Sequence, residues 1–530
     1  MKPEETLVHV SSLPVGEVLP AFEEEFGRSL TDLFSQMVRM GPYPKSITAP
    51  PGAICFLARD GVEKRLCVLS SGAKESPFFQ EAEGHASTAA AGGDTYQVKV
   101  CELTHANALT LRKHIPFLRP RTAGLEKSIG LGDRLGLATP GHARAVAGTG
   151  VTPFFAQQSI REMERTHRTP DEVMDCASFG TLQEGFRAGF GSDADHLKQP
   201  EHIDYTAAAG FTMFTVDPGD HVDSDSDSDD DAALMKKYEG LPWSDLEISA
   251  ADCRKLYVGR PMPGGIEAFG EKHLLRAAAK YGKAVAHTVK MYRHARTVMR
   301  RRPFELEMSV DETATPTTVY EHFYVAAELR RLGVRWVSLA PRFVGEFEKG
   351  VDYIGDIDYF RTEFEKHAAV MKALGPYKIS VHSGSDKFAV YPVAAELADN
   401  LVHVKTAGTS YLEALRAISM IDPPLFREIL AFAKERYPED RATYHVSAEA
   451  ERVPDPNDLK DADLPGLFEP DRIDAREVMH VTFGSVLTTK KPDGGWLFYD
   501  RFMAALRGDE EKYYGVLESH LGKHVAPFAD

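Results

Sequence analysis

The chain has 530 residues, an apolar fraction of 43% and a formal net charge of −17 at pH 7. This length suggests more than one domain, and the apolar content is that of a globular protein with a large core. The net charge and a pI of about 5.7 argue against nucleic-acid binding, because no basic stripe offsets the acidic residues. The sequence contains no stretch of 18 apolar residues, so we expect no membrane-spanning helix.

The cysteines and the first residues of the chain indicate the compartment. There are five cysteines, and none of them forms a CxxC pair. The opening stretch MKPEETLVHV contains no apolar leader segment. We therefore expect free thiols in a cytoplasmic protein.

Residues 1–120 are expected to form a small α+β accessory region. An apolar helix is predicted within residues 21–40. Short strands separated by Gly, Asp and Ser turns are predicted at 53–61, 64–72 and 95–103. Few polar side chains converge in this region, so it is not expected to carry the chemistry.

A different pattern covers residues 121–530, where short apolar runs alternate with amphipathic helical stretches. Thr169 to Glu172 forms a helix start with a cap, a proline and a capping-box glutamate, and Thr315-Pro316 starts a helix that stops at Gly333. Repeated strand–helix alternation predicts parallel strands. Ten runs are candidate strands, which is too many for an eight-stranded barrel, so one or two of them must be additional: 133–141, 152–159, 187–196, 211–220, 304–312, 335–343, 378–386, 401–409, 442–451 and 478–486.

A (β/α)8 TIM-barrel-like fold is predicted over a doubly wound open sheet. Polar residues cluster at the carboxyl ends of successive runs, where barrel enzymes build their sites. An open sheet would concentrate them at one switch point instead.

The stretch at 217–231, DPGDHVDSDSDSDDD, contains eight Asp and no Lys or Arg. It lacks the Gly at the sixth position and the Glu at the twelfth position of a Ca²⁺-binding loop. We expect an inserted, mobile and solvated loop that lies near the basic helix at 271–302.

Four histidines lie on four separate runs: His196, His382, His403 and His445. Because the strand ends of a barrel converge, imidazoles and carboxylates there form the ligand set of a catalytic divalent cation. His403 is two residues before Lys405, so a position deeper in the barrel is expected for it. Other polar residues at run ends include Asp193, Asp217, Asp311, Ser380, Ser383, Asp386, Thr406 and Glu449.

Several of these residues also have a purely structural interpretation. Asp217 precedes a proline and is expected to cap the next helix. His480 is expected to lie in the core. Lys405 is expected to point from the rim toward an anionic or carbonyl group, with a Schiff base as the less favoured role.

Other catalytic classes lack their motifs. No GxGxxG follows a strand, and neither GxxxxGK[ST] nor GxSxG occurs. The groups present suit proton transfer on a polyhydroxylated, acidic small molecule.

The chain resembles the tagaturonate epimerase family over residues 125 to 500. The similarity is carried by many strings, among them FFAQQSIREMERTHRTPDEVM, GSDADHLK, FTVDPGDHVD, VSLAPRFVGEFEKGVDYIGD, SVHSGSDKF, HVKTAGTSYLEALR, ATYHVSAEAERVP and HVTFGSVL. The resemblance implies a TIM-barrel-like fold and interconversion of D-tagaturonate and D-fructuronate in hexuronate catabolism. It also implies a divalent metal cation, for which Zn, Mn, Ni and Co are candidates.

The resemblance further implies roles for individual residues. The expected metal ligands are His196, His382 and His445. The expected proton acceptor and donor are Asp195 and Glu312, which may exchange roles with their neighbours Asp193 and Asp311. The expected substrate contacts are Lys198, Arg342 and Lys405.

The expected reaction inverts C4 of a sugar acid whose carbonyl is at C2. The C4 hydrogen is not adjacent to that carbonyl, so simple enolisation does not epimerise C4. Retro-aldol cleavage between C3 and C4, rotation of the aldehyde and re-addition is the economical route. The alternatives are a metal-dependent aldolase or isomerase of a related ketose, and a non-catalytic sugar-acid-binding protein.

Overall fold

The N-terminal part of the chain is built on a five-stranded antiparallel sheet. The computed structural model describes residues 27–70, 76–91 and 94–530. The strand order is β1-β2-β3-β5-β4. The strands are β1 (Gly41–Pro42), β2 (Ile54–Asp60), β3 (Glu63–Ser70), β4 (His85–Ala91) and β5 (Asp94–Cys101). The three strands predicted here are β2, β3 and β5, and β1 and β4 are additional.

Three helices accompany this sheet: α3 (Gly27–Val38), α4 (Pro77–Glu81) and α5 (His105–His114). The helix predicted within 21–40 corresponds to α3, and the part before residue 27 lies outside the described residues. One face of the sheet shares its apolar core with Phe179 and Leu182, which belong to a helix of the second region. The predicted boundary at 120–121 falls just after the short helix η2 (Pro116–Leu118).

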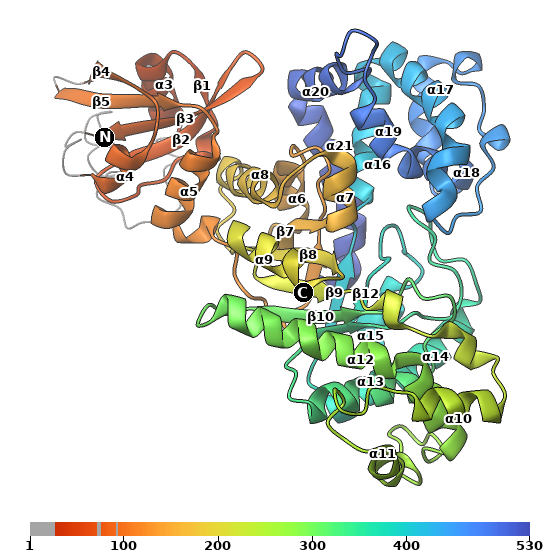
Figure 1. The fold of residues 1–530 in the computed structure, drawn as a ribbon. Coiled ribbons are helices and arrows are strands. Elements are labelled where there is room, and N and C mark those ends of the chain that lie inside the picture. The colour runs from red at the N-terminus through yellow and green to blue at the C-terminus, as the bar shows by residue number, and fades with distance from the viewer. Residues whose placement is uncertain (1–26, 71–75, 92–93) are drawn as a thin grey trace.

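The second region is a closed barrel of eight parallel strands, so the predicted (β/α)8 fold is confirmed (Figure 1). Strands follow one another in chain order, and β13 closes the barrel on β6. They are β6 (Ser128–Gly130), β7 (Thr152–Ser159), β8 (Gly191–Leu197), β9 (Met213–Val216), β10 (Glu305–Ser309), β11 (Ser338–Ala340), β12 (Lys378–Val381) and β13 (Val402–Lys405).

Three of the ten predicted strands are wrong. The run at 133–141 follows β6 and leads into a helix, and the run at 442–451 is mostly irregular. The run at 478–486 is helical, in α18 (Ile473–Val481) and α19 (Phe483–Thr488). A short apolar run fits a buried helix as well as a buried strand, and α18 is buried at Ala475, Val478 and Met479.

Helices cover the barrel between its strands. The predicted capping box is present at α8, where Thr169 accepts from the backbone N–H of Glu172. The helix predicted from Thr315 starts three residues later, because Thr318 and Glu321 form the capping box instead. These helices are α6 (Thr139–Val146), α7 (Ile160–Thr166), α8 (Pro170–Gln183), α9 (Pro200–Ala209), α13 (Val319–Arg331), α14 (Ile357–Leu374) and α15 (Tyr391–Leu397).

The chain between β9 and β10 makes a long excursion. It contains the short helices η3 (Gly219–His221) and η4 (Ser224–Asp227), followed by α10 (Asp231–Glu239), α11 (Ala250–Tyr257) and α12 (Glu271–Met299). The basic helix predicted at 271–302 is therefore α12, which lies with α10 and α11 in the lower part of Figure 1.

The acidic tract in this excursion is anchored to α12, while seven of its eight aspartates remain partly or fully exposed. Lys280 of α12 lies 2.8 Å from Asp227, and its own side chain is fully buried. Ser226 is also fully buried. The backbone N–H of Asp223 donates to the carbonyl of Lys280. The tract thus packs on α12, the neighbour that the sequence predicted for it.

The C-terminal part forms a helical layer beside the barrel, drawn in blue in Figure 1. It comprises α18 and α19 together with α16 (Thr409–Ile421), α17 (Pro423–Asp440), α20 (Tyr499–Gly508) and α21 (Glu510–Val525). Helix α21 packs on both α6 and α16.

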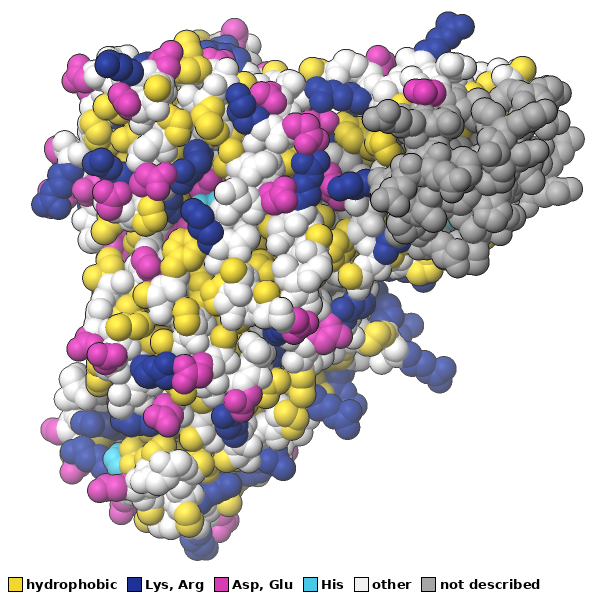
Figure 2. All heavy atoms as spheres, turned by 180° about the vertical axis from the view of Figure 1, so that it is seen from behind, with side chains coloured by type: hydrophobic (Ala, Val, Ile, Leu, Met, Phe, Trp, Pro, Cys, Tyr) yellow, Lys and Arg dark blue, Asp and Glu magenta, His cyan; other side chains and the backbone are white. Residues whose placement is uncertain are grey.

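The surface carries charges of both signs. On the face drawn in Figure 2, acidic and basic side chains are interspersed rather than gathered into one field. Within the described ranges, every helix is too short or too polar to cross a membrane.

Candidate active site

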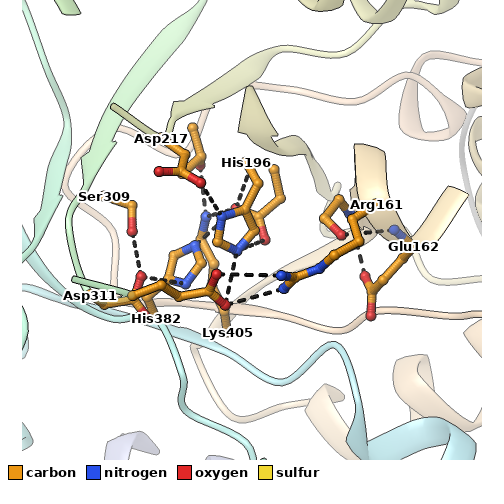
Figure 3. Close-up of polar contacts among 12 residues, drawn as sticks. Arg161, Glu162, His196, Asp217, Ser309, Asp311, His382 and Lys405 are labelled. Carbon is orange, nitrogen blue, oxygen red and sulfur yellow. Dashed lines mark hydrogen bonds and ion pairs between the residues drawn. The ribbon is translucent and has the colours of Figure 1, made fainter. Parts of the chain in front are cut away.

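Polar side chains from the carboxyl ends of the barrel strands converge, as the sequence predicts. Figure 3 shows this group, with His196 and His382 facing one another and Arg161 reaching toward them. The strand ends contribute Arg161 and Glu162 after β7, Asp195 and His196 in β8, Asp217 after β9, Asp311 and Glu312 after β10, His382 after β12, and Lys405 in β13.

A local distortion of β8 brings two consecutive residues into the site. In a regular strand, Asp195 and His196 would point to opposite faces. His196 has a φ of +53°, and the register with β9 shifts between Ala194 and Leu197. Bulges of this kind redirect side chains next to active sites, and a non-glycine residue in the left-handed region carries strain.

Each of the two histidines has a carboxylate at its Nδ1 atom. His196 Nδ1 is hydrogen-bonded to Asp217 Oδ2 at 3.1 Å. His382 Nδ1 lies 3.2 Å from Asp311 Oδ1. With Nδ1 held in this way, Nε2 of each ring is left for another partner, which is the usual arrangement of metal-binding histidines.

Both Nε2 atoms lie near Asp195. The distances are 2.9 Å from His382 Nε2 to Asp195 Oδ1 and 3.9 Å from His196 Nε2 to Asp195 Oδ2. The three residues offer ligand atoms within 4.8 Å of one another. Two imidazoles and a carboxylate suit a divalent cation of the zinc, manganese, nickel or cobalt type.

The electrostatics of the group favour added positive charge. Burial lowers the pKa of His382, but Asp311 and Asp195 outweigh it and hold this pKa well above its usual value. The pKa of His196 is also raised, because Asp195 and Glu312 outweigh the effect of burial. Protons and metal ions compete for the same Nε2 atoms, so the field that attracts one attracts the other.

Lys405 lies inside the barrel, beneath this group. Its Nζ is 2.8 Å from Asp193 Oδ2, 2.9 Å from Asp195 Oδ1 and 3.0 Å from Glu307 Oε1. Its side chain is only 2% exposed. Burial lowers the pKa of Lys405, but these carboxylates raise it above the ordinary value. A permanently charged ammonium does not form a Schiff base, and its contacts hold Asp195 in place.

His403 lies deeper in the barrel than Lys405, as the strand period predicts. It is fully buried, and its Nδ1 lies 2.9 Å from Ser128 Oγ. Burial holds the pKa of His403 well below its usual value, so it is neutral.

Two cations missed by sequence reasoning hold Glu312. Its Oε1 is 3.2 Å from both Arg161 Nη2 and Lys349 Nζ. It is also 3.9 Å from His196 Nε2. Although burial raises the pKa of Glu312, His196, Lys349 and Arg161 bring it well below its usual value. Arg161 could have been identified from the sequence, because it lies two residues beyond the end of β7. Lys349 lies in a long loop after β11, where no pattern in the sequence marks it.

Two connected cavities open onto this group. The outer one has a volume of about 230 Å³ and the inner one about 50 Å³. Both are lined by Arg161, Lys349, His382, Ser383 and Tyr444. The outer cavity adds Glu312, Arg342, Phe343, Phe347 and His445, and the inner one adds Arg134, Asp195, His196, Lys405 and His480.

The structure does not bring His445 to the other two imidazoles. It follows η5 (Arg441–Thr443) in an irregular segment, not in a strand, and its side chain is 76% exposed. Its Nε2 lies 3.1 Å from Glu346 Oε2 at the outer cavity. Asp195 takes the third place in the candidate ligand group that His445 was expected to fill.

The expected substrate contacts are in different positions. Arg342 lines the outer cavity, donating to the carbonyl of Thr313 with Glu346 3.5 Å away. Lys198 lines neither of these two cavities; it is 42% exposed and pairs with Asp220 at 2.9 Å.

Asp217 does not take the helix-capping role that the sequence predicted, because Pro218 is at the N-cap of η3 and no side chain of the described residues caps that helix. One of its oxygens accepts from the backbone N–H of Gly219 at 2.9 Å, in a local turn. The other is the partner of His196 Nδ1, which makes Asp217 part of the site.

A second group with ligand-type side chains does not fit a metal. Asp386, His520 and His524 lie together and are buried. Asp386 is paired with Arg476 Nη2 at 3.0 Å, and its backbone N–H donates to His524 Nε2. The guanidinium already supplies the positive charge, so we interpret this group as a link between α21 and the loop after β12.

Comparisons with known proteins identify relatives over nearly the whole chain. A sequence model of the family described as tagaturonate epimerase matches residues 43–528. The tagaturonate/fructuronate epimerase of Thermotoga maritima is 42% identical over 513 residues, covering 96% of this chain and 99% of the relative. A glycerol-complexed crystal structure of the fructuronate-tagaturonate epimerase UxaE from Cohnella laeviribosi has 37% identity and a TM-score of 0.86, covering 94% of this chain and 99% of that one. The native crystal structure of the same enzyme also has a TM-score of 0.86, with 36% identity.

Proposed function

The chain belongs to the tagaturonate epimerase family, and we propose that it interconverts D-tagaturonate and D-fructuronate by inversion at C4. The observation that carries this proposal is the meeting of Asp195, His196 and His382 at the carboxyl ends of the barrel strands. They adjoin two cavities lined by cations and carboxylates, as an acidic sugar substrate requires.

We propose that Asp195, His196 and His382 hold a divalent cation. The carboxylates of Asp217 and Asp311 at the two Nδ1 atoms support this assignment. A cation bound there would act as a Lewis acid toward the oxygen atoms of the substrate. Asp195 was expected as the proton acceptor. Asp195 does not line the outer cavity, and its Oδ1 lies 2.9 Å from both His382 Nε2 and Lys405 Nζ, which supports a ligand role rather than a role as proton acceptor.

Glu312 is the proposed proton carrier. It lines the outer cavity and lies beside His196, and Lys349 at 3.2 Å holds its carboxylate in place. In the retro-aldol direction, Glu312 takes the proton of the C4 hydroxyl. The C3–C4 bond breaks, its electron pair forms the C2–C3 enediolate, and C4 becomes an aldehyde carbon.

Inversion follows from rotation of the aldehyde before the C3–C4 bond forms again. The enediolate attacks the other face of the aldehyde, and the new C4 alkoxide takes back the proton that Glu312 accepted, which returns Glu312 to its carboxylate form. Arg342 in the outer cavity binds the substrate carboxylate through its guanidinium. Arg161 and Lys349 line both cavities, and their positive charges retain the acidic aldehyde fragment in the site.

The direct test is incubation of the metal-loaded protein with tagaturonate, followed by NMR. Appearance of fructuronate supports epimerisation, and accumulation of three-carbon fragments would instead indicate an aldolase. In deuterated water the retro-aldol route keeps the original hydrogen on C4. Deuterium at C4 would contradict that route and favour direct proton abstraction.

Glu312→Gln tests the proton carrier. We expect kcat to fall by roughly 100-fold to 10,000-fold, the usual contribution of a general acid–base group. Metal content should stay at the wild-type value. A variant that keeps full kcat would remove Glu312 from the mechanism.

A further inference from the structure

The inner cavity contains two polar groups that the proposed reaction has not used, Arg134 and His480. Sequence reasoning placed His480 in the core, and in the structure it is indeed only 2% exposed. It nevertheless lines the same cavity as Asp195 and His196. Its ring is therefore buried from solvent but borders the candidate active site.

His480 has no hydrogen-bond partner among the described residues. Its Nδ1 atom is buried and unpaired. Burial, together with the nearby charges of Arg134 and Lys349, holds the pKa of His480 well below its usual value. A neutral imidazole offers one N–H donor and one acceptor nitrogen. An imidazole nitrogen that is left without a hydrogen-bond partner in a closed core destabilises the fold.

The backbone around His480 is shaped to admit its ring. A Cβ atom on Gly408 would lie 1.9 Å from His480 Cε1, so any side chain there would collide with the imidazole. A Cβ on Gly350 would lie 3.3 Å from His480 Nδ1, and Gly350 has a φ of +74°. These glycines belong to the segments that follow β13 and β11. Two loops of the barrel thus leave room for a side chain that comes from α18.

Arg134 supplies a complementary group in the same cavity. Its Nε and Nη2 atoms both donate to Glu162 Oε1, at 2.8 and 2.5 Å. The guanidinium lies over the ring of Phe483, 3.8 Å from its centroid. Its Nη1 atom is buried and has no partner. Arg134 therefore offers the free N–H groups of Nη1, while its charge is balanced by Glu162.

We propose that Arg134 and His480 form a subsite that binds the uncharged, hydroxyl-bearing end of the substrate. This inference rests on the proposed function. A hydroxyl group is both donor and acceptor, so it pairs with the free N–H of Arg134 and the acceptor nitrogen of His480 at once.

The same arrangement disfavours a carboxylate in the inner cavity. Its cations Arg134 and Lys405 are already paired with buried carboxylates, Glu162 in the first case and Asp193, Asp195 and Glu307 in the second, so neither is left to bind a carboxylate. The volume of about 50 Å³ also suits a small terminal group rather than half of the sugar. In the outer cavity, the ion-pair partner of Arg342 among the described residues is Glu346, 3.5 Å away. The substrate thus lies with its carboxylate outside and its C1 hydroxymethyl group inside.

The test uses His480→Leu, which removes both hydrogen-bonding atoms, and His480→Gln, which keeps a donor and an acceptor. For His480→Leu we expect the KM for tagaturonate to rise at least roughly 10-fold, the equivalent of about 1.4 kcal/mol. Metal content should be unchanged, and the thermal midpoint without substrate should stay or rise, because an unpaired imidazole has been removed from the interior. His480→Gln should recover part of the KM.

A matched control is His287→Leu. His287 also has a buried, unpaired Nε2 atom, but it stacks on His221 and lines neither cavity of the site. We expect its KM to equal that of the wild type. An unchanged KM in His480→Leu, or an equal rise in His287→Leu, would overturn the subsite.

The orientation of the substrate is tested by ionic strength. Salt weakens charge–charge attraction, so the KM of the wild type and of His480→Leu should rise with salt. Arg342→Gln should have a higher KM that responds less to salt. The reverse pattern would place the carboxylate in the inner cavity and refute the assignment.

The outcomes for the proposed function and for the subsite can be told apart. If the wild type does not turn over tagaturonate, the proposed function fails. If the wild type does turn it over and His480→Leu has the same KM, only the subsite fails.

Discussion

Asp195 and His196 are consecutive residues of β8, and both side chains reach the same site because His196 has a φ of +53°. The strand alone would direct them to opposite faces. The distortion places His196 Nε2 and the carboxylate of Asp195 beside His382 Nε2. The candidate ligand group thus depends on the backbone of one residue as well as on three side chains.

The ligand group gives a first prediction, which separates His382 from His445. His382→Ala should lower the affinity for the divalent cation by more than roughly 100-fold. Loss of a residue that only supports a metal ligand costs up to roughly 100-fold, and loss of the ligand itself should cost more. His445→Ala should keep wild-type metal content, because that ring is exposed and meets Glu346 instead. Metal analysis after dialysis measures both. Loss of metal in His445→Ala would restore it to the ligand set.

A second prediction concerns the carboxylate behind His196. Asp217→Asn replaces the acceptor at His196 Nδ1 and should weaken metal binding by roughly 10-fold to 100-fold. Asp220→Asn is the matched control, since Asp220 lies three residues away and, within the part of the chain that the structure describes, pairs with the exposed Lys198. Titration with Co²⁺, followed by its absorption spectrum, measures the two affinities. Equal affinities in the two variants would show that Asp217 does not orient His196.

A third prediction concerns the dependence of stability on pH. Burial and the neighbouring Glu348 raise the pKa of Glu477 from 4.5 to about 8. The folded protein therefore keeps a proton that the unfolded chain releases above pH 4.5. The stabilisation is complete below pH 4.5 and is lost as the pH rises through 8, with a slope of at most about 1.4 kcal/mol per pH unit.

Glu477→Gln isolates this contribution, because the amide stays neutral at every pH. Between pH 6 and 8 the thermal midpoint of the wild type should fall more steeply than that of the variant. Differential scanning fluorimetry in a buffer series gives both slopes. Parallel curves would mean that Glu477 is ionised in the folded protein throughout this range.

A fourth prediction concerns the acidic tract. Lys280 is fully buried between Asp227 at 2.8 Å and Glu321 at 3.3 Å. Lys280→Met leaves the buried Glu321 without its cation and should destabilise the protein by about 3–5 kcal/mol, the cost of breaking a buried pair. Lys283→Met, on an exposed position of the same helix, should have little effect. Equal denaturation midpoints for the two variants would indicate that the tract is not held by Lys280.

Much of the fold was predictable because it rests on local patterns. Seven barrel strands were recognised from short apolar runs that alternate with capped helices, as at Thr169 and Glu172. The failures were apolar runs without a deciding local signal. The run that contains His480 is buried on every side in α18, and such a run has neither a period of two nor a clear polar face.

The sequence by itself determined that the runs carrying His196, Glu312 and His382 would end at the same rim, because the carboxyl ends of parallel barrel strands converge whatever their loops do. The distortion at His196 that brings Asp195 into the same site has no signal in that pattern. Only the tertiary structure decided what each one contacts. Lys405 pairs with Asp195 across 210 residues, and Arg161 and Lys349 reach Glu312 from separate loops. His445 and His480 were two similar histidines in two similar runs, and the fold left the first exposed while it placed the second beside the inner cavity. Loop paths and long-range charge pairs arise from packing between distant segments, and no local pattern in the chain encodes them.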